Sequence, residues 1–273
     1  MTSAQTASPA RTRRFFGLSD LRLVGRQVYY EQLSFWLNPI GAIFTVGFSV
    51  VFLILLGASA GSSRVKLLGN IKLIQYYVPA FVAYGVMSAC FTALAVVLVN
   101  RRETGLLKRL RLSPLPAWAL LGAIFISTLL VAFVEVIVLL ALGRFAFSVQ
   151  LPASVGAFVI AVVVGALCFT ALGAATSTLI PNEDAAAPVV NVVFFVLLFL
   201  SGLWFPIKDG SGLAEFSRYL PLRPFIKAVF APFNSEKGVS PWAWNDLLVV
   251  AIWGVVAGAF AIWRFRWAPY RNR

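Results

Sequence analysis

The feature that most constrains this chain is a series of six apolar stretches, each long enough to cross a lipid bilayer. The hydrocarbon core of a bilayer is about 30 Å thick, and a helix needs about 20 apolar residues to cross it. All six stretches are expected to be helices, because a strand edge facing lipid would leave backbone groups without hydrogen-bond partners. The sequence therefore predicts an all-α polytopic membrane protein with six transmembrane helices, at 37–57, 77–99, 118–142, 155–180, 187–205 and 247–263.

The composition supports this class and argues against a nucleic-acid-binding protein. Hydrophobic residues make up 60% of the chain and charged residues only 12%, whereas a soluble domain is about a quarter charged. The net charge of +13 could indicate nucleic-acid binding, but the basic residues lie between the apolar stretches and leave no basic surface on a soluble fold. We expect a multi-pass protein of the cell membrane that contacts membrane lipids and no nucleic acid.

The distribution of Lys and Arg favours a cytoplasmic location for both termini, N-in and C-in. Cytoplasmic segments carry an excess of these residues, and an even number of spans puts both termini on one side. With the N-terminus inside, the cytoplasmic segments hold Arg11, Arg13, Arg14, Arg22, Arg26, Arg101, Arg102, Lys108, Arg109, Arg111, Arg264, Arg266, Arg271 and Arg273. The outer segments hold fewer, over longer loops: Arg64, Lys66, Lys72, Arg144, Lys208, Arg218, Arg223, Lys227 and Lys237.

The segments at the two ends of the chain lie outside the spans. Residues 1–14 and 268–273 are predicted to be cytoplasmic tails, the first of them disordered. Residues 15–36 have apolar side chains at roughly helical spacing among charged ones, which predicts an amphipathic helix lying in the cytoplasmic interface. This helix is either an anchor for the first span or a functional contact surface.

A second unusual segment precedes the last span. Residues 206–244 are rich in large apolar side chains but are divided by Pro221 and Pro224. The segment is too interrupted to span and too apolar to lie in water. It is expected to form short re-entrant helices that dip into the outer leaflet or cover the top of a pathway.

The loop after the second span is the most informative segment. It reads NRRETGLLKRLRLSPLP from Asn100 to Pro116 and crowds five cations and Glu103 beside Leu106, Leu107 and Leu110. Such a short helix has an apolar and a basic face, and Pro114 ends it. From composition alone, it is equally well an ordinary basic loop that only fixes topology.

The sequences of two segments resemble those of one protein family. The run from Arg102 to Pro114 is similar to the loop between the second and third spans of type-2 ABC transporter permeases, the membrane domains of ATP-binding-cassette exporters of drugs, polysaccharides and lipids. Phe199–Ile207, with Leu220-Pro221 beyond it, resembles the end of the fifth span in that family. The resemblance covers 37–267, which is identified as a type-2 ABC transmembrane domain.

The resemblance implies a role for the basic loop. In the family this loop is a coupling helix seated in a groove of the ATPase subunit, with its cations toward acidic groups or lipid phosphates and its leucines packed against protein. The residues that the resemblance assigns to the ATPase-coupling loop here are Arg101, Arg102, Glu103, Leu106, Lys108, Arg109, Leu110 and Arg111.

The resemblance also implies partners. The chain contains no phosphate-binding string of Gly, four residues and Gly-Lys-Ser/Thr, so we expect no enzyme activity and no cofactor bound by this chain, with ATP and Mg on a partner ATPase subunit. The family assembles two permeases around one route, which implies a homodimer or a heterodimer with a related permease. The substrate stays open among drugs, lipids and glycans.

Several side chains inside the spans are candidates for the translocation pathway. Glu135 lies in the third span, where a charge is costly, and is expected to face protein or a wet cavity. It either contacts a substrate or a proton, or is a protonated or hydrogen-bonded carboxyl that holds helices together. Phe194, Phe195 and Phe199 are further candidates, although packing and lipid-facing phenylalanines are more common.

Small residues and cysteines have simpler explanations. Gly254 and Gly258, and the group Gly165, Gly173 and Ala174, predict close helix packing. The absence of histidine and the placement of Cys90 and Cys168 inside apolar runs predict no metal site and no disulfide framework.

Two rival functions remain for comparison. A secondary transporter or channel with no ATPase partner predicts several ionisable or Gly/Pro-broken sites at mid-bilayer, and a single carboxylate is found in the predicted spans. A membrane-embedded enzyme predicts clustered His, Asp, Glu or Cys, which the spans do not carry.

Overall fold

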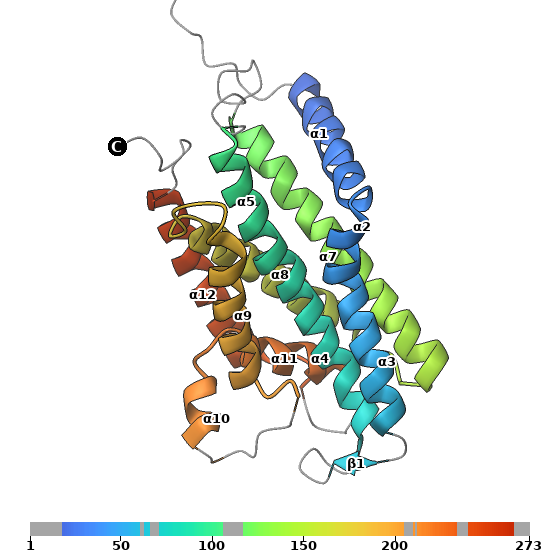
Figure 1. Cartoon of the computed structure of the whole chain (residues 1–273). Helices are drawn as coiled ribbons and strands as arrows, with labels where there is room; N and C mark the ends of the chain where they lie inside the picture. The colour runs from blue at the N-terminus through green and yellow to red at the C-terminus, as the bar shows by residue number, and fades with distance from the viewer. Residues whose placement is uncertain are drawn as a thin grey trace, which may run out of the picture.

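A computed structural model describes most of the chain, and its helices form one bundle (Figure 1). The predicted tails at 1–14 and 268–273 lie outside the described residues. The residues described are 18–60, 63–65, 71–105, 117–204, 210, 212–233 and 240–264.

The N-terminal part is a long helical segment with one break. Its elements are, in order, α1 (Leu18–Trp36), α2 (Pro39–Ala42), the π-helical segment η1 (Ile43–Gly47) and α3 (Phe48–Ala60). The break falls at Asn38, whose Oδ1 accepts a hydrogen bond from the backbone N–H of Gly41 at 3.2 Å, while Pro39 occupies the first helical turn. Both are favoured at helix N-termini, so the first span begins at this point.

A second helical segment is the most deeply buried of the bundle. It consists of α4 (Leu73–Met87), the π-helical segment η3 (Ser88–Ala93) and α5 (Leu94–Glu103). A short antiparallel pair, β1 (Arg64–Val65) and β2 (Ile71–Lys72), joins it to α3. This pair lies in a loop that the all-α prediction left without strands.

The C-terminal part supplies the rest of the bundle. Its elements are α7 (Ala117–Phe147), α8 (Val155–Ser177), α9 (Ala186–Leu200), α10 (Gly212–Ser217), α11 (Leu222–Phe230), the 3₁₀ turn η4 (Ala231–Phe233) and α12 (Trp244–Arg264). α8 and α12 form the most extensive helix pair of the bundle, and α11 packs against α4, α8 and α12.

Within the residues that the structure describes, five helices are long and apolar enough to cross a membrane: Pro39–Ala60, Leu73–Glu103, Ala119–Phe147, Val155–Ser177 and Trp244–Arg264. The chain is thus a polytopic membrane protein. The remaining predicted span, 187–205, appears as the 15-residue helix α9, about 22 Å long at 1.5 Å per residue. It ends early because the chain turns at Ser201 and Gly202, and Gly202 has a φ of 81°, a conformation that glycine adopts readily.

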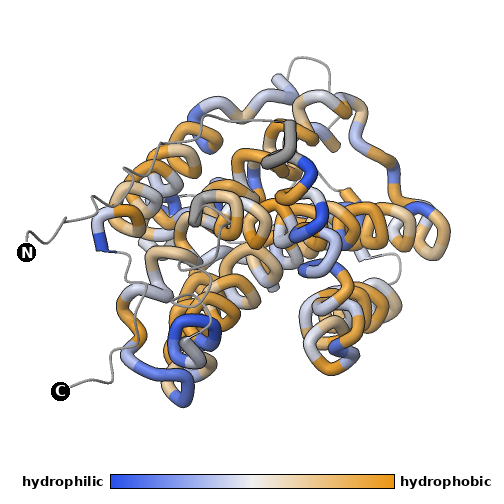
Figure 2. Tube along the Cα trace, turned by 90° about the horizontal axis from the view of Figure 1, so that it is seen from above, coloured by the Kyte–Doolittle hydropathy of each residue, from blue (hydrophilic) through white to orange (hydrophobic). Residues whose placement is uncertain are grey.

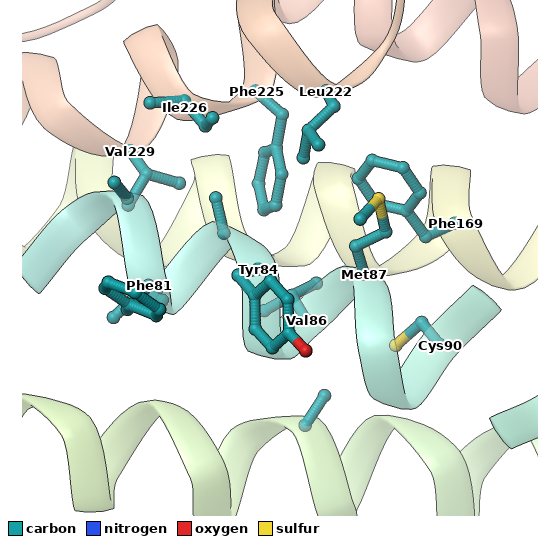
Figure 3. Packing of buried hydrophobic residues seen from close by; sticks show 14 of the residues in the cluster. Phe81, Tyr84, Val86, Met87, Cys90, Phe169, Leu222, Phe225, Ile226 and Val229 are labelled. Carbon is teal, nitrogen blue, oxygen red and sulfur yellow. The ribbon is translucent and has the colours of Figure 1, made fainter. Parts of the chain in front are cut away.

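Hydrophobic residues occur along the helices throughout the bundle (Figure 2), and their side chains are buried at some positions and exposed on the outer face at others. Exposed residues such as Ile137, Val163 and Val255 fit a surface solvated by lipid rather than water. In Figure 3, the side chains of Leu222, Phe225, Ile226 and Val229 of α11 point toward α4 and α8, where Phe225 lies near Phe169, whereas Tyr84 points to the other side of α4.

The predicted close packing at small residues is confirmed at Gly165, Gly173 and Gly254, whereas a Cβ on Gly258 would make only an ordinary contact, 3.8 Å from the Cβ of Ala171. A Cβ on Gly173 of α8 would lie 2.8 Å from the carbonyl oxygen of Phe91, and one on Gly254 of α12 would lie 3.1 Å from the Cα of Cys168. A Cβ on Gly165 would overlap the ring of Phe225. Glycine at these positions lets the backbones approach closely, as is common between membrane helices.

Candidate functional site

The end of α5 that leads into the basic loop is fastened to α1. Arg101 makes a bidentate ion pair with Glu31 of α1, its Nη1 donating to Oε1 at 2.7 Å and its Nη2 to Oε2. Gln27 of α1 also donates to Glu31 Oε1, at 3.0 Å. Both charged side chains are largely shielded from solvent, and bidentate Arg–carboxylate pairs of this kind have a fixed geometry. The first cation of the predicted coupling loop is therefore paired inside the chain.

The next residue fastens the same end to α8. Arg102 is 4% exposed, and its guanidinium donates to the carbonyl oxygens of Ser177, at 2.9 Å, and Ile180. The Ser177 carbonyl lies at the C-terminal end of α8, where helices leave carbonyl groups without intrahelical partners and favour a cation, and Ile180 follows in the turn after the helix. Glu103 accepts a hydrogen bond from Arg102 Nε at 3.1 Å. Arg101 and Arg102 thus connect the start of the loop to two different helices.

Beyond Glu103 the helix ends at Thr104 and at Gly105, which has a φ of 69°. The remaining residues predicted for the coupling loop lie outside the described part of the chain: Leu106, Lys108, Arg109, Leu110 and Arg111. Their assignment to the loop stays a prediction.

A cavity of about 160 Å³ lies between α1, α5 and α7. Glu31 and Arg101 line it, together with Asn38, Ser127 and Thr128. Next to it, Gln32 of α1 donates to the carbonyl oxygen and the hydroxyl of Ser127 of α7, at 2.7 and 2.8 Å. This cavity places a charged pair beside apolar walls, a combination that the sequence alone did not indicate.

Glu135 is fully buried between three helices. It is 0% exposed and shares a short hydrogen bond with the hydroxyl of Ser49 in α3. Its carboxyl group fills the space beside Gly85 of α4 that a Cβ would otherwise occupy. Ser49 Oγ also donates to Val46 O at 2.9 Å. Because a hydroxyl has a single proton, both bonds form together only when the Glu135 carboxyl supplies the second proton.

The three phenylalanines of α9 divide into two environments. Phe194 is 5% exposed and packs edge-on against Tyr84 of α4, with ring centroids 5.5 Å apart. Phe195 and Phe199 are 49% and 68% exposed and stack on each other with centroids 6.3 Å apart. Phe194 is therefore part of the protein interior, whereas the other two form an apolar outer face of α9.

Sequence reasoning missed the partners that organise this region. Glu31 and Arg101 are 70 positions apart, and nothing in their local sequence indicates that they pair. A second buried arginine, Arg223 of α11, was counted only as a loop cation. It donates to Ser217 Oγ at 2.7 Å and to the carbonyl oxygen of Ala214, both in α10. A cation within an otherwise apolar helical segment is the one signal that could have marked it.

The long apolar helices and the buried core define a multi-pass protein of the cell membrane. A family model of ABC-2 family transporter proteins matches residues 68–263. The chain therefore belongs to the ABC-2 transporter family.

Curated relatives agree with this assignment. The chain is similar to the probable multidrug ABC transporter permease YbhR of Escherichia coli (strain K12), at 23% identity over 72% of this chain and 54% of YbhR. It thus spans about half the length of that relative. It is also similar to the putative transport permease YvfS of Bacillus subtilis (strain 168), at 24% identity over 64% of this chain and 70% of YvfS.

Proposed function

We propose that this permease is the membrane-spanning subunit of an ATP-driven exporter whose ATPase is a separate polypeptide with its own ATP and Mg. One observation supports coupling through the basic loop: the end of α5 is bonded to two helices, through Arg101 to α1 and through Arg102 to α8. Because both ties lie at the start of the basic loop, a force applied to that loop reaches two helices of the bundle directly. Such ties suit a lever that transmits domain motion across an interface.

The coupling surface in this proposal is the loop that begins at Arg101. Arg101, Arg102 and Glu103 hold its start to the bundle, which leaves the later cations to meet acidic groups of the ATPase. Those later residues are Leu106, Lys108, Arg109, Leu110 and Arg111, with the leucines as the packing side. Charged pairs across interfaces of this kind fix register and orientation.

The substrate class is proposed from the relatives and from the apolar interior. The name of the Escherichia coli relative refers to multidrug transport, which supports export of apolar drugs, with lipids and glycans as the other classes. The rival function, a secondary transporter or channel with no ATPase partner, predicts several ionisable or Gly/Pro-broken sites at mid-bilayer. In the described spans, Glu135 is instead enclosed by α3, α4 and α7.

We further propose six membrane crossings with both termini in the cytoplasm. In this arrangement α9 makes the fifth crossing, and α10 and α11 form the re-entrant segment on the outer side. The burial of α11 among α4, α8 and α12 supports this, because backbone outside spanning helices is tolerated at membrane depth only where protein covers it. α1 is placed at the cytoplasmic side, where it packs along the first part of α7.

A second permease, either another copy or a related chain, is proposed as the partner inside the membrane. The exposed face of α9 carries Phe195 and Phe199, and α3 exposes Val51, Ile54 and Leu55. Two such apolar faces can enclose one route between two permeases, with the stacked phenylalanines on its wall.

The proposed orientation predicts which side of the membrane each loop occupies. A cysteine replacing Ala153, in the exposed turn before α8, is expected to react with a membrane-impermeant maleimide in intact cells. A cysteine replacing Thr104, exposed after α5, is expected to react only after the cells are opened. Cys90 and Cys168 are buried and provide an unreactive background. Labelling of Thr104→Cys in intact cells would refute the orientation.

The coupling proposal is tested with the ATPase encoded by a neighbouring gene. We expect the two proteins to co-purify, and the double variant Arg109→Glu/Arg111→Glu to hydrolyse ATP in the complex while transport falls at least about tenfold, since reversed interface charges cost several kcal/mol. The charge-preserving variant Arg109→Lys/Arg111→Lys is the matched control and is expected to keep most of its transport. Normal transport by the reversed variant would mean that the loop only sets topology.

A further inference from the structure

The cavity between α1, α5 and α7 is built from helix faces with a regular order. On the α4–η3–α5 helix its wall consists of Ala89, Ala93, Val97 and Arg101, which follow one another at i, i+4 spacing along one face, together with Leu94 beside Ala93. On α1 the wall runs from Glu31 to Phe35, and on α7 from Ile124 to Val131. The three helices lie side by side in Figure 1. Their walls therefore form one elongated site rather than a chance gap between loops.

Charge and apolarity are separated along this site. The ion pair of Glu31 and Arg101 occupies the end next to the basic loop, and the wall beyond it is largely apolar. Of the other polar side chains that line the site, Asn38, Ser127 and Thr128 are bonded within the protein, and Ser34 is exposed. Ser127 is held by Gln32, and Thr128 donates to the backbone of its own helix at 2.9 Å. The charged end of the site is thus the end that the proposed orientation puts at the cytoplasmic surface. A lipid of the inner leaflet has the same order, with its headgroup at that surface and its acyl chains deeper in the membrane.

The ion pair determines the kind of headgroup that fits. Glu31 receives the two terminal nitrogens of Arg101, and a guanidinium has five N–H donors, so donors remain for an anion. The carboxylate oxygens likewise have lone pairs left for a cation. A pair of opposite charges is best complemented by another pair of opposite charges in the reverse order. A headgroup with an ammonium and a phosphate meets this requirement, whereas a purely anionic headgroup would face Glu31 unpaired.

The size of the site limits what enters its apolar part. A cavity of about 150 Å³ holds a benzene-sized group, and this one has about 160 Å³. It therefore accommodates a segment of one acyl chain beside Ala93 and Val97, with the rest of the lipid outside.

We propose that this cavity binds one zwitterionic phospholipid of the inner leaflet, with its ammonium at Glu31, its phosphate at Arg101 and the first part of an acyl chain along Ala93 and Val97. The inference rests on the orientation in the proposed function but not on ATP-driven transport. The lipid would touch both helices that the Glu31–Arg101 pair joins, directly before the coupling loop.

The test uses the purified full-length permease without any ATPase, in nanodiscs that contain trace amounts of photoactivatable lipid. Phosphatidylethanolamine and phosphatidylglycerol with the same diazirine-bearing acyl chain are compared, and cross-linked peptides are mapped by mass spectrometry. We expect peptides of α1, α5 and α7 to be labelled about tenfold more by the ethanolamine lipid, the preference that one additional charge-assisted contact provides.

Two variants separate specific binding from the surrounding lipid shell. Val97→Phe fills the apolar part of the cavity and is expected to remove most of this labelling. Val134→Phe, on the exposed side of α7 at 38% exposure, is the matched control and is expected to leave it unchanged. Glu31→Gln is expected to abolish the preference for ethanolamine over glycerol headgroups. The elution profile of each variant on size exclusion verifies that it is folded.

Equal labelling by the two lipids, or undiminished labelling of a folded Val97→Phe protein, would overturn the proposal. These readouts do not involve ATP hydrolysis. A permease that binds the lipid but couples to no ATPase would refute the proposed function alone, and loss of lipid preference with intact coupling would refute only the lipid site.

Discussion

Replacing Gly173 by valine is expected to prevent accumulation of folded permease almost completely. At this position α8 packs directly on the π-helical segment η3, and a Cβ would lie 2.8 Å from the carbonyl oxygen of Phe91 and 2.9 Å from that of Cys90. Both obstructing atoms belong to backbone, so no side-chain rotation can relieve the overlap. Overpacking of a tight interior costs about 1–3 kcal/mol and more where the surroundings cannot yield, and a branched side chain adds two further methyl groups.

The measurement is the amount of monodisperse protein on size exclusion of detergent extracts, together with its thermal unfolding temperature. Gly122→Val is the matched control, because it lies in the helix α7 and a Cβ there meets nothing within 4 Å. We expect this control to accumulate normally. If Gly173→Val accumulated and unfolded like the unaltered protein, the contact between α8 and η3 would not exist in the native bundle.

The second large effect is expected at Glu135. Glu135→Lys should abolish folding, because it places an ammonium where α3, α4 and α7 leave no water and no acidic partner within the described contacts. A lysine at the centre of a membrane helix costs about 3 kcal/mol, and the longer side chain also collides with the backbone near Gly85.

Glu135→Gln distinguishes the two roles that the sequence leaves open. An amide has nearly the shape of a protonated carboxyl and can donate a hydrogen bond to Ser49, so a purely structural Glu135 predicts normal folding and normal transport for this variant. A role in contacting a proton or a substrate predicts normal folding with lost transport. The comparison therefore needs both the unfolding temperature and a transport rate measured on the same preparation.

Hydropathy alone was sufficient to predict most of the bundle. The third, fourth and sixth predicted spans agree with α7, α8 and α12 within a few residues at most ends, because an apolar run of this length has no soluble alternative. The prediction for the second span was too short. Its helix continues through Arg101 and Arg102 to Glu103, since these charges find partners in α1 and α8 that hydropathy does not register.

The turn after α9 shows the opposite error. The run 187–205 is mostly apolar, with Asn191 and Ser201 as its polar residues, so hydropathy alone gave no reason to end the helix before Phe205. The structure ends it at Leu200, where the Ser201 hydroxyl bonds back to the carbonyl of Leu198 at 2.7 Å and also accepts from the N–H of Leu203. Serine hydroxyls compete with helix backbone in this way, but the outcome depends on packing against other helices, as in the bond from Tyr76 to the carbonyl of Gly202.

The candidate site was predictable only as a list of charges. The sequence identified the cations of the basic loop, but their division into two groups depends on the fold. Arg101 and Arg102 are used inside the chain, while Lys108, Arg109 and Arg111 remain assigned by resemblance alone. The cavity next to Arg101 could not be predicted, because three helices distant in sequence contribute its walls.

The uneven packing around α5 has a mechanical consequence. On one side, η3 at the start of α5 approaches α8 backbone to backbone at Gly173, and α8 approaches α12 at Gly254, so that these three elements should behave as a stiff plate. On the other side, the cavity and the Glu31–Arg101 ion pair lie between α5 and the helices α1 and α7, which makes that side more flexible. A force applied from the cytosolic side would then move α1 and α7 relative to the plate. Any gate that opens in this subunit is expected on the side of α1 and α7.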